Sequence, residues 1–506
     1  MNIKMLTRLA LLAAVLGMVA YGQGTAFAAT PPGQEPPLRL SEPIDVVIAD
    51  LERNIPAYMR EEDIPGLAIA LIRDGEVVWT QGFGVANAIT RRPVTPETLF
   101  EVASNSKVVT AYIALRLVDQ GILSLDEPLN AYLPEPWLPS SEYRDLVTLR
   151  HVLSHTSGLG ASIVLNKDLR FAPGSNYYYS GIGYLYLQEV IEQVTGRPLE
   201  EVAREMVFEP LGMSSSSFVS DVTTAPRVAN GHVNLALPIL LFTCPSSIIF
   251  GVVGLIGLVV LRVWTGQWRP TRAMVVGACV AAAFLFLVLV FATIGETLLS
   301  LLPEFVSLTL TSTAGFALVF AVTLFVGRQL VTRLFASRVG ENWLRVLNVL
   351  WAVVSFVVLL WLASSFTNVP VPNGPPPRPN TTGTLRTTAS DLAILLTELA
   401  EPQHLGPEIE AQMRTPQVSL GRDLSWGLGF GIQHGEQGDA LWQWGQHFDF
   451  QSVMIVYPEH GLGVVVCTNN DLFNPDVALE VAHRALGGQI EPIRRAIHLE
   501  FNYRGG

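Results

Sequence analysis

The chain has 506 residues, of which 49% are hydrophobic and only 15% charged, and its mean hydropathy is +0.37. This composition is too apolar for an ordinary soluble enzyme and indicates membrane spans. The formal net charge of −12 argues against a nucleic-acid partner, and the three cysteines form neither a disulfide framework nor a CxxC metal site.

The N-terminus has the pattern of a secretory signal peptide. Lys4 and Arg8 form a basic start, residues 9–21 form a short apolar core, and residues 26–28 have the small-x-small form of a cleavage site. We interpret residues 1–28 as a signal peptide that is removed after Ala28. The alternative is an uncleaved anchor, and under both interpretations the following residues leave the cytoplasm.

Residues 43–234 alternate between strand and helix patterns, as expected for an α/β domain. The stretch at 66–84 predicts two strands joined by a turn at Asp74-Gly75. The stretch at 106–121 has helical apolar spacing and ends at Gly121, a typical helix C-cap.

A Ser-x-x-Lys tetrad, Ser104 to Lys107, precedes this helix in a chain that has only three lysines. Positions i and i+3 of a helix lie on one face, so the Ser104 hydroxyl and the Lys107 amine can meet. A serine hydroxyl becomes a good nucleophile when a base takes its proton, and burial at a helix N-terminus favours the neutral amine. The alternative is a solvated serine and lysine on an exposed helix.

The surroundings of this tetrad carry a resemblance to a known family. Residues 66–135 and the stretch TLRHVLSHTSGL at 148–159 resemble the class C branch of the serine β-lactamase and penicillin-binding protein family. That branch includes D-alanyl-D-alanine carboxypeptidases, esterases and D-amino-acid peptidases. The resemblance implies an antiparallel sheet flanked by helices, and an acyl-enzyme mechanism without metal or cofactor. We interpret His151 and His155 as structural, since they lack further ligands at metal spacing.

The second family motif is Tyr-x-Asn after a Pro-Gly, and PGSNYYYSGIGY at 173–184 matches it in part. The resemblance places Tyr179 at the tyrosine position, where a phenol next to the lysine can relay protons. The alternative is that Tyr177–Tyr179 are packing aromatics, which we expect for two of the three. Gly181 stands where the family has Asn, so recognition of a substrate amide loses its usual donor; Asn105 or Asn176 can replace it.

Four apolar runs without interior charge follow, each about 18–22 residues long and therefore long enough to cross a bilayer. They lie at 240–261, 273–294, 308–326 and 347–363. The first and third connecting loops carry arginines and the second carries only acidic residues. The positive-inside rule places the arginine loops in the cytoplasm and both flanks outside. We predict that residues 235–368 are a four-helix transmembrane insertion in one domain.

The second flank completes the predicted domain. A Pro-rich linker at 369–380 leads into its second part at 381–487, followed by a tail at 488–506. Residues 387–400 predict a helix capped by Ser390 or Asp391. Three antiparallel strands are predicted at 426–435, 451–459 and 462–469.

The third family motif is Lys-Thr-Gly or His-x-Gly, and QWGQHFDFQS at 443–452 resembles its His-Trp-Gly variant. Gln443 occupies the cationic position, and Gly445 suits a strand that a substrate approaches closely. A neutral Gln443 holds a carboxylate less well than a charged donor, which favours esters or uncharged amides. His447 is either a replacement for that cation or an exposed loop residue.

The resemblance assigns residues to three roles. It implies a nucleophile and proton relay of Ser104, Lys107 and Tyr179, and an oxyanion hole formed by the backbone amides of Ser104 and Gln446. Substrate contacts are expected at Asn105, Gly181, Gln443, Trp444 and Gly445.

We therefore predict a membrane-anchored extracytoplasmic serine hydrolase, placed in the plasma or inner membrane. Its substrate is a small molecule or a peptidoglycan-like fragment: a β-lactam, a D-Ala-type peptide or a carboxylic ester. The alternative is a catalytically weak sensor or scaffold that binds wall fragments. Since the apolar runs contain no interior charge, they do not indicate a transporter.

Overall fold

The computed structural model describes residues 36–161, 167–219, 225–233, 369–370, 379–447, 449–470 and 476–504, and the single positions 347, 350 and 351. The chain divides into two compact units. One unit combines Met1–Ala229 with Pro376–Gly506, and the other is Asn230–Pro375. The two flanks of the predicted insertion thus belong to one unit.

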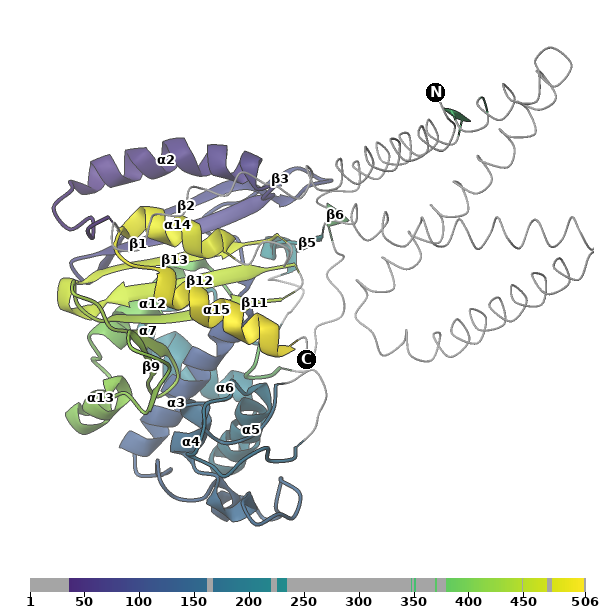
Figure 1. Cartoon of the computed structure of the whole chain (residues 1–506), viewed down its shortest axis with the longest axis vertical. Helices are drawn as coiled ribbons and strands as arrows, with labels where there is room; N and C mark the ends of the chain where they lie inside the picture. Colours follow the sequence, from purple (N-terminus) through teal and green to yellow (C-terminus); the bar gives the residue numbers. More distant parts are fainter. Residues whose placement is uncertain are drawn as a thin grey trace, which may run out of the picture. The chain divides into compact units, whose positions relative to one another are not determined.

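A nine-stranded antiparallel sheet forms the centre of the first unit, in the order β3-β2-β1-β13-β12-β11-β10-β9-β8 (Figure 1). Its strands are β1 Gly66–Arg73, β2 Glu76–Asn87, β3 Arg92–Pro93, β8 Val418–Ser419, β9 Leu424–Trp426, β10 Gly431–Gln433, β11 Ala440–Gln446, β12 Gln451–Tyr457 and β13 Leu462–Thr468. β1 from the first flank pairs with β13 from the second, from Leu67↔Thr468 to Ile72↔Gly463. Both flanks are therefore needed to build the sheet.

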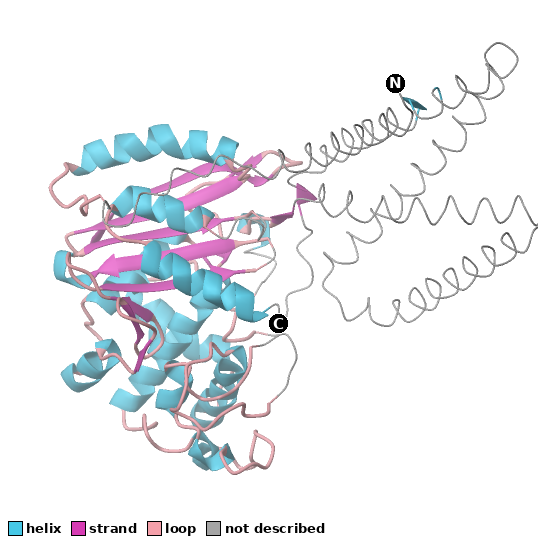
Figure 2. Ribbon diagram, in the orientation of Figure 1, coloured by secondary structure: helices cyan, strands magenta, loops and turns pink. Residues whose placement is uncertain are grey.

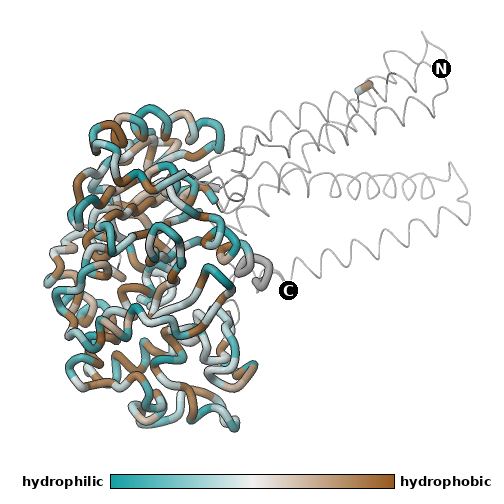
Figure 3. Tube along the Cα trace, turned by 60° about the vertical axis from the view of Figure 1, so that its left-hand side comes forward, coloured by the Kyte–Doolittle hydropathy of each residue, from teal (hydrophilic) through white to brown (hydrophobic). Residues whose placement is uncertain are grey.

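Helices cover both faces of this sheet (Figure 2). Successive side chains of a strand point to opposite faces. Ala68 and Ala70 of β1 join the core with α3 Ser106–Asp119, α5 Gly181–Thr195 and α12 Ala389–Ala400. Leu67 and Ile69 join the core with α2 Ile44–Glu61, α14 Val477–Leu486 and α15 Glu491–Arg504. Figure 3 shows hydrophobic and hydrophilic residues alternating along this unit, as two buried layers require.

Shorter elements fill the rest of the first unit. The helices are α4 Leu149–Leu153, α6 Leu199–Ala203, α7 Glu209–Leu211 and α13 Pro407–Arg414, with the single turns η1 Ala103–Asn105, η2 Leu129–Tyr132, η3 Arg144–Leu146, η4 Arg204–Phe208, η5 Ala225–Arg227 and η7 Pro458–His460. A two-stranded pair joins β4 Phe100–Glu101 to β7 Arg386–Thr387. This pair carries the chain directly into η1, which contains Ser104.

Most local predictions are confirmed. The β1–β2 hairpin turns at Asp74 and Gly75, whose positive φ angles of 54° and 78° suit a tight hairpin turn. Helix α3 is followed by Gly121 at φ 71°, whose N–H donates to Val118 O. The strands predicted at 451–459 and 462–469 are β12 and β13.

Two local predictions are wrong. The cap of α12 is Thr388, which accepts from the Asp391 N–H, and neither Ser390 nor Asp391 caps the helix. The Asp391 carboxylate instead accepts from the Ser215 N–H at 2.8 Å. The strand predicted at 426–435 is divided into β9 and β10, because the chain turns at Gly429 (φ 107°), where an added Cβ would lie 2.3 Å from the Ala111 Cβ.

The predicted signal peptide and most of the predicted insertion lie outside the described residues. Of the four apolar runs, the structure describes only positions 347, 350 and 351, which are helical. No helix within the described ranges has the length and apolarity needed to cross a bilayer. In the second unit, β5 His232–Val233 pairs antiparallel with β6 Val369–Pro370, at the two ends of the insertion.

Candidate active site

Ser104 lies in η1, the single turn that leads into α3, and is 5% exposed. The turn is held in place by one hydrogen bond to the second flank and by one within the turn itself. Val102 N–H donates to Leu385 O at 3.1 Å, and Ser106 Oγ donates to Ala103 O at 2.6 Å. Ala103 has a φ of +46°, which is unfavourable for a residue with a Cβ and is typical of functional sites.

Lys107 lies on the first turn of α3 and is 2% exposed. Its Nζ is 2.9 Å from Ser104 Oγ, so the two side chains meet as the i, i+3 spacing predicts. The same Nζ donates to the backbone carbonyl of Thr382 at 3.1 Å. A buried lysine that contacts a serine hydroxyl has the arrangement of a base beside its nucleophile.

Tyr179 joins this pair from the loop before α5. The Lys107 Nζ lies 5.1 Å from the centroid of its ring. The imidazole of His155 packs on the same ring, with the centroids 4.1 Å apart. Ser104 and Lys107 therefore lie in one buried cluster with Tyr179, which is distant from them in the sequence.

Gln443, on β11, connects the parts of this cluster. Its side-chain Nε2 donates to the Tyr179 hydroxyl at 3.2 Å and to the Ser104 carbonyl at 3.4 Å. The side chain is 2% exposed. The residue at the expected cationic position is therefore a neutral amide whose N–H groups already have acceptors within the protein.

Gly445 allows η1 to pack directly on β11. An added Cβ would lie 2.0 Å from Val102 O and 3.0 Å from Ser104 N. We expected a glycine here because a substrate approaches the strand closely. The structure shows a further reason: the protein's own backbone, including the Ser104 amide, approaches this point.

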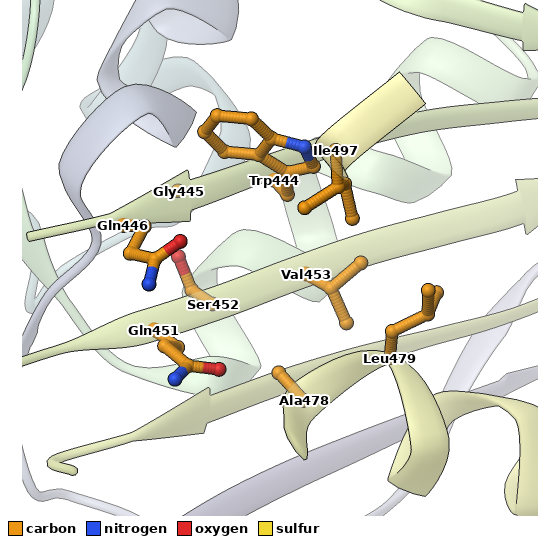
Figure 4. Close-up of a pocket in the computed structure, with 9 residues that line it drawn as sticks. All are labelled: Trp444, Gly445, Gln446, Gln451, Ser452, Val453, Ala478, Leu479 and Ile497. Carbon is orange, nitrogen blue, oxygen red and sulfur yellow. The ribbon is translucent and has the colours of Figure 1, made fainter. Parts of the chain in front are cut away.

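Trp444 and Gln446 direct their side chains into a small pocket, which they share with Ala478, Leu479 and Ile497 from the helices that cover the sheet (Figure 4). Gln446 is buried, and its Nε2 has no hydrogen-bond partner among the described residues. The Trp444 indole also lies 5.9 Å from the Tyr179 ring. Because the Gln446 side chain lies in this pocket, only the backbone of Gln446 is available for a hydrogen bond beside Ser104.

Asn105 and Gly181, two of the expected substrate contacts, are both buried within the protein. Asn105 is completely buried, and its Nδ2 donates to Ser452 Oγ at 2.8 Å, which attaches η1 to β12. Gly181 is the buried first residue of α5, directly after the N-cap Ser180. Asn176 is exposed, and its Nδ2 donates to Ser175 Oγ.

The two histidines of the 148–159 stretch have structural contacts. His151 forms a capping box with Thr148 at the start of α4. His155 is completely buried, and its Nδ1 accepts from the Ser180 N–H at 3.0 Å. Burial, together with the charge of Lys107, lowers the pKa of His155 well below its usual value. It therefore packs against Tyr179 as a neutral ring.

A charged cluster beside η1 was not anticipated from the sequence. His447 Nδ1 is hydrogen-bonded to Glu101, and Arg386 Nη2 lies 3.6 Å from the same carboxylate. Burial acts to raise the pKa of Glu101, but His447 and Arg386 hold it below its usual value. Burial and the charge of Glu101 raise the pKa of Asp449 to about 6. These residues come from both flanks, so no local motif joins them.

The cysteine, histidine and carboxylate side chains in the described ranges form no group of three that could hold a metal ion.

A protein-family model described as "Beta-lactamase" matches residues 51–241 and 360–489, more than half of the chain. Esterase EstB of Burkholderia gladioli is 34% identical over 194 residues, which are 32% of this chain and 49% of the esterase. A D-aminopeptidase of Brucella anthropi is 33% identical over 186 residues, 33% of this chain and 35% of the peptidase. The chain thus spans half or less of the length of these relatives.

Solved structures share the fold at low sequence identity. The octameric penicillin-binding protein homologue from Pyrococcus abyssi has a TM-score of 0.56 at 20% identity, covering 87% of this chain and 76% of that chain. A class C beta-lactamase has a TM-score of 0.53 at 15% identity, covering 87% of this chain and 95% of that chain.

Proposed function

The chain belongs to the beta-lactamase family, and on this premise we propose that it is a serine hydrolase with Ser104 as nucleophile. The observation that carries this proposal is the 2.9 Å contact between the buried Lys107 Nζ and Ser104 Oγ. Such a contact lets an amine take the hydroxyl proton as the oxygen attacks.

The proposed reaction has two stages. Ser104 Oγ attacks the substrate carbonyl carbon while its proton passes to Lys107, and the leaving group departs with a proton delivered through Tyr179. Water then attacks the acyl-enzyme, the acid product leaves, and Ser104 Oγ regains a proton. The Ser104 and Gln446 amides stabilise the tetrahedral oxyanion, a contribution typically worth about 10²–10³ in rate per donor. The packing of η1 on β11 at Gly445 supports this role.

We propose that the substrate is a neutral carboxylic ester or uncharged amide, in preference to an anionic β-lactam. The amide of Gln443 stands where the resemblance predicts a cation, and its N–H groups donate to Tyr179 and to Ser104. An uncharged donor binds a carboxylate less strongly than a charged one. Similarity to the esterase supports this choice.

A test uses the full-length protein in detergent micelles with p-nitrophenyl butyrate, nitrocefin and a fluorescent penicillin. We expect wild type to hydrolyse the ester fastest and Ser104→Ala to lose at least about 10³-fold in kcat/KM. Ser175→Ala, an exposed serine in the loop before Tyr179, is the matched control and should keep its rate. Equal rates for wild type and Ser104→Ala would contradict the proposal.

The second candidate is a sensor or scaffold that binds wall fragments without turnover. The glycine at position 181 and the neutral Gln443 favour it, because both remove groups that the family uses for substrates. Stoichiometric labelling of Ser104 without steady-state hydrolysis of any probe would support this alternative over the hydrolase.

We also propose that the domain is anchored in the membrane and faces the extracytoplasmic side. The support is the sequence pattern of four apolar runs and arginine-bearing first and third loops. Alkaline phosphatase fused after residue 504 should be active, and the same reporter fused at residue 268 should be inactive. The reverse pattern would contradict this orientation.

A further inference from the structure

A second hydrogen-bond partner of Lys107 comes from a turn on the other flank of the chain. Lys107 Nζ lies 2.9 Å from Ser104 Oγ and 3.1 Å from Thr382 O. A lysine side chain is flexible, and a neutral amine has only one lone pair. With one N–H directed at the Thr382 carbonyl, the lone pair can point to the Ser104 hydroxyl.

The Thr382 carbonyl is placed by the side chain of Asn380. Asn380 Oδ1 accepts from Thr382 N at 3.0 Å, Thr382 Oγ1 at 2.6 Å and Gly383 N at 3.1 Å. This is an Asx turn, in which a side-chain oxygen replaces a backbone acceptor and fixes the turn. Thr384 Oγ1 closes the turn, because it accepts from Asn380 N at 2.9 Å and lies 3.1 Å from Asn380 O.

The turn is attached to α5, the helix that starts two residues after Tyr179. Gln188 Nε2 donates to Pro379 O at 3.0 Å, and Gln188 Oε1 accepts from Thr381 N at 3.1 Å. Thr381 Oγ1 donates to Tyr184 O at 2.7 Å. One helix therefore sets the position of both Tyr179 and the turn that contacts Lys107.

On its other side the turn leads into the segment that holds η1. Leu385 N–H donates to Ser106 Oγ at 3.2 Å, and Leu385 O accepts from the Val102 N–H. Gly383 lies against the imidazole of His447, since an added Cβ would be 2.6 Å from its Nε2. The turn is thus constrained by α5, by η1 and by the residue that follows β11.

We propose that Asn380 is a positioning residue of the catalytic centre, which directs the Lys107 amine at Ser104 through the Thr382 carbonyl. This rests on the proposed function. Its effect on Lys107 is transmitted by the hydrogen bonds of the turn. The turn belongs to the part of the first unit that follows the inserted residues in the sequence.

The test is steady-state hydrolysis of p-nitrophenyl butyrate by full-length variants in detergent. Asn380→Ala should lower kcat about 10- to 100-fold, with KM within about threefold, because misplacing a catalytic group by 1 Å can cost about 10²-fold. Asn380→Asp keeps the accepting oxygen and should recover kcat to within about fivefold of wild type.

The matched control is Asn87→Ala. Asn87 Oδ1 accepts from the Ile89 and Thr90 N–H groups in an exposed Asx turn after β2, so its loss changes a turn without touching the catalytic cluster. Its kcat should stay within about twofold of wild type. If Asn380→Ala does not fold, Thr382→Val, which removes one of the three donors to Asn380, should lower kcat about 3- to 10-fold at unchanged KM.

Two results would overturn the inference. One is a kcat for Asn380→Ala, or for Thr382→Val in its place, equal to that of Asn87→Ala. The other is a loss in Asn380→Ala that Asn380→Asp does not recover. Failure of the proposed function is seen separately, as retained activity in Ser104→Ala.

Discussion

Gln443 is the residue on which the proposed substrate preference depends. Its buried amide donates to the Tyr179 hydroxyl and to the Ser104 carbonyl, so it organises the cluster without adding a charge. A lysine at this position would keep a donor near Tyr179 and bring a cation to the cleft. The difference between an amide and an ammonium group is therefore testable at one position.

Gln443→Lys should change the ratio of kcat/KM for nitrocefin to that for p-nitrophenyl butyrate by at least about tenfold in favour of nitrocefin. The reason is that a charged donor holds the nitrocefin carboxylate about twice as strongly as a neutral one. Gln443→Met is the control of similar volume, which should lower both rates without changing the ratio. An unchanged ratio in Gln443→Lys would show that position 443 does not determine selectivity.

Asp449 makes stability depend on pH. Burial and Glu101 raise its pKa from 3.8 to about 6, while His447 and Arg386 act in the opposite direction. When folding raises the pKa of a carboxyl group, the folded protein loses stability as the pH rises from the unfolded-state pKa, here 3.8, through the folded-state pKa of about 6. Asp449→Asn should therefore be more stable than wild type by about 1–2 kcal/mol at pH 8 and by little at pH 4.

Thermal unfolding of both proteins at these two pH values measures the effect. The lowered pKa of Glu101 has the opposite effect on stability: it stabilises the folded protein above about pH 4.5, and this stabilisation is lost as the pH falls below that value. It is present in both proteins and largely cancels in the difference. A stability gain in Asp449→Asn that is equal at pH 4 and pH 8 would contradict this assignment.

At the scale of elements, the contact between η1 and β11 determines where Ser104 lies. Gly445→Ala places a Cβ 2.0 Å from Val102 O, so η1 must move away from the strand. We expect a loss of at least about 100-fold in kcat/KM, as for removal of an oxyanion donor, and a lower free energy of unfolding by about 1–3 kcal/mol.

Gly160→Ala is the matched control for this substitution. Its added Cβ meets nothing nearer than the flexible Arg170 side chain at 3.6 Å, so activity and stability should change little. Kinetics and denaturant unfolding of the two variants separate a general effect of adding a methyl group from the effect on η1. Full activity in Gly445→Ala would show that the packing of η1 on β11 is not required.

At the scale of the whole molecule, two distant parts of the chain form one sheet, and the ends of the inserted segment meet. Val233 of β5 is paired with Val369 of β6. An antiparallel pair of this kind can be closed by a two-residue Asn-Gly turn. Replacing residues 234–368 by Asn-Gly should therefore leave a domain that unfolds in one cooperative transition.

Circular dichroism and calorimetry on this shortened protein test the prediction. The same replacement in the Ser104→Ala background should give an equal melting temperature, since the proposed function gives Ser104 a catalytic and not a structural role. A molten or aggregated product would show that the inserted residues are needed for folding of the first unit.

Much of this architecture follows from local patterns in the sequence. The hairpin at Asp74-Gly75, helix α3 with its terminal glycine, and strands β12 and β13 are encoded by periodicity and turn residues over fewer than twenty positions. The approach of Ser104 to Lys107 is equally local, because a helical i, i+3 spacing brings them together. Family motifs add Tyr179 and β11.

The sequence by itself therefore determined the approach of Lys107 to Ser104 and the strands β1, β2, β12 and β13. Only the tertiary structure decided what surrounds them. Lys107 donates a hydrogen bond to the Thr382 carbonyl, 275 residues away in the sequence, and the Gln443 amide donates one to the Tyr179 hydroxyl, 264 residues away. It also decided that Gly445 accommodates η1 and that Asn105 is buried. Spacing along a helix or strand encodes contacts within a few residues. Contacts between the two flanks depend on β1 and β13 pairing across the insertion, which no local pattern specifies.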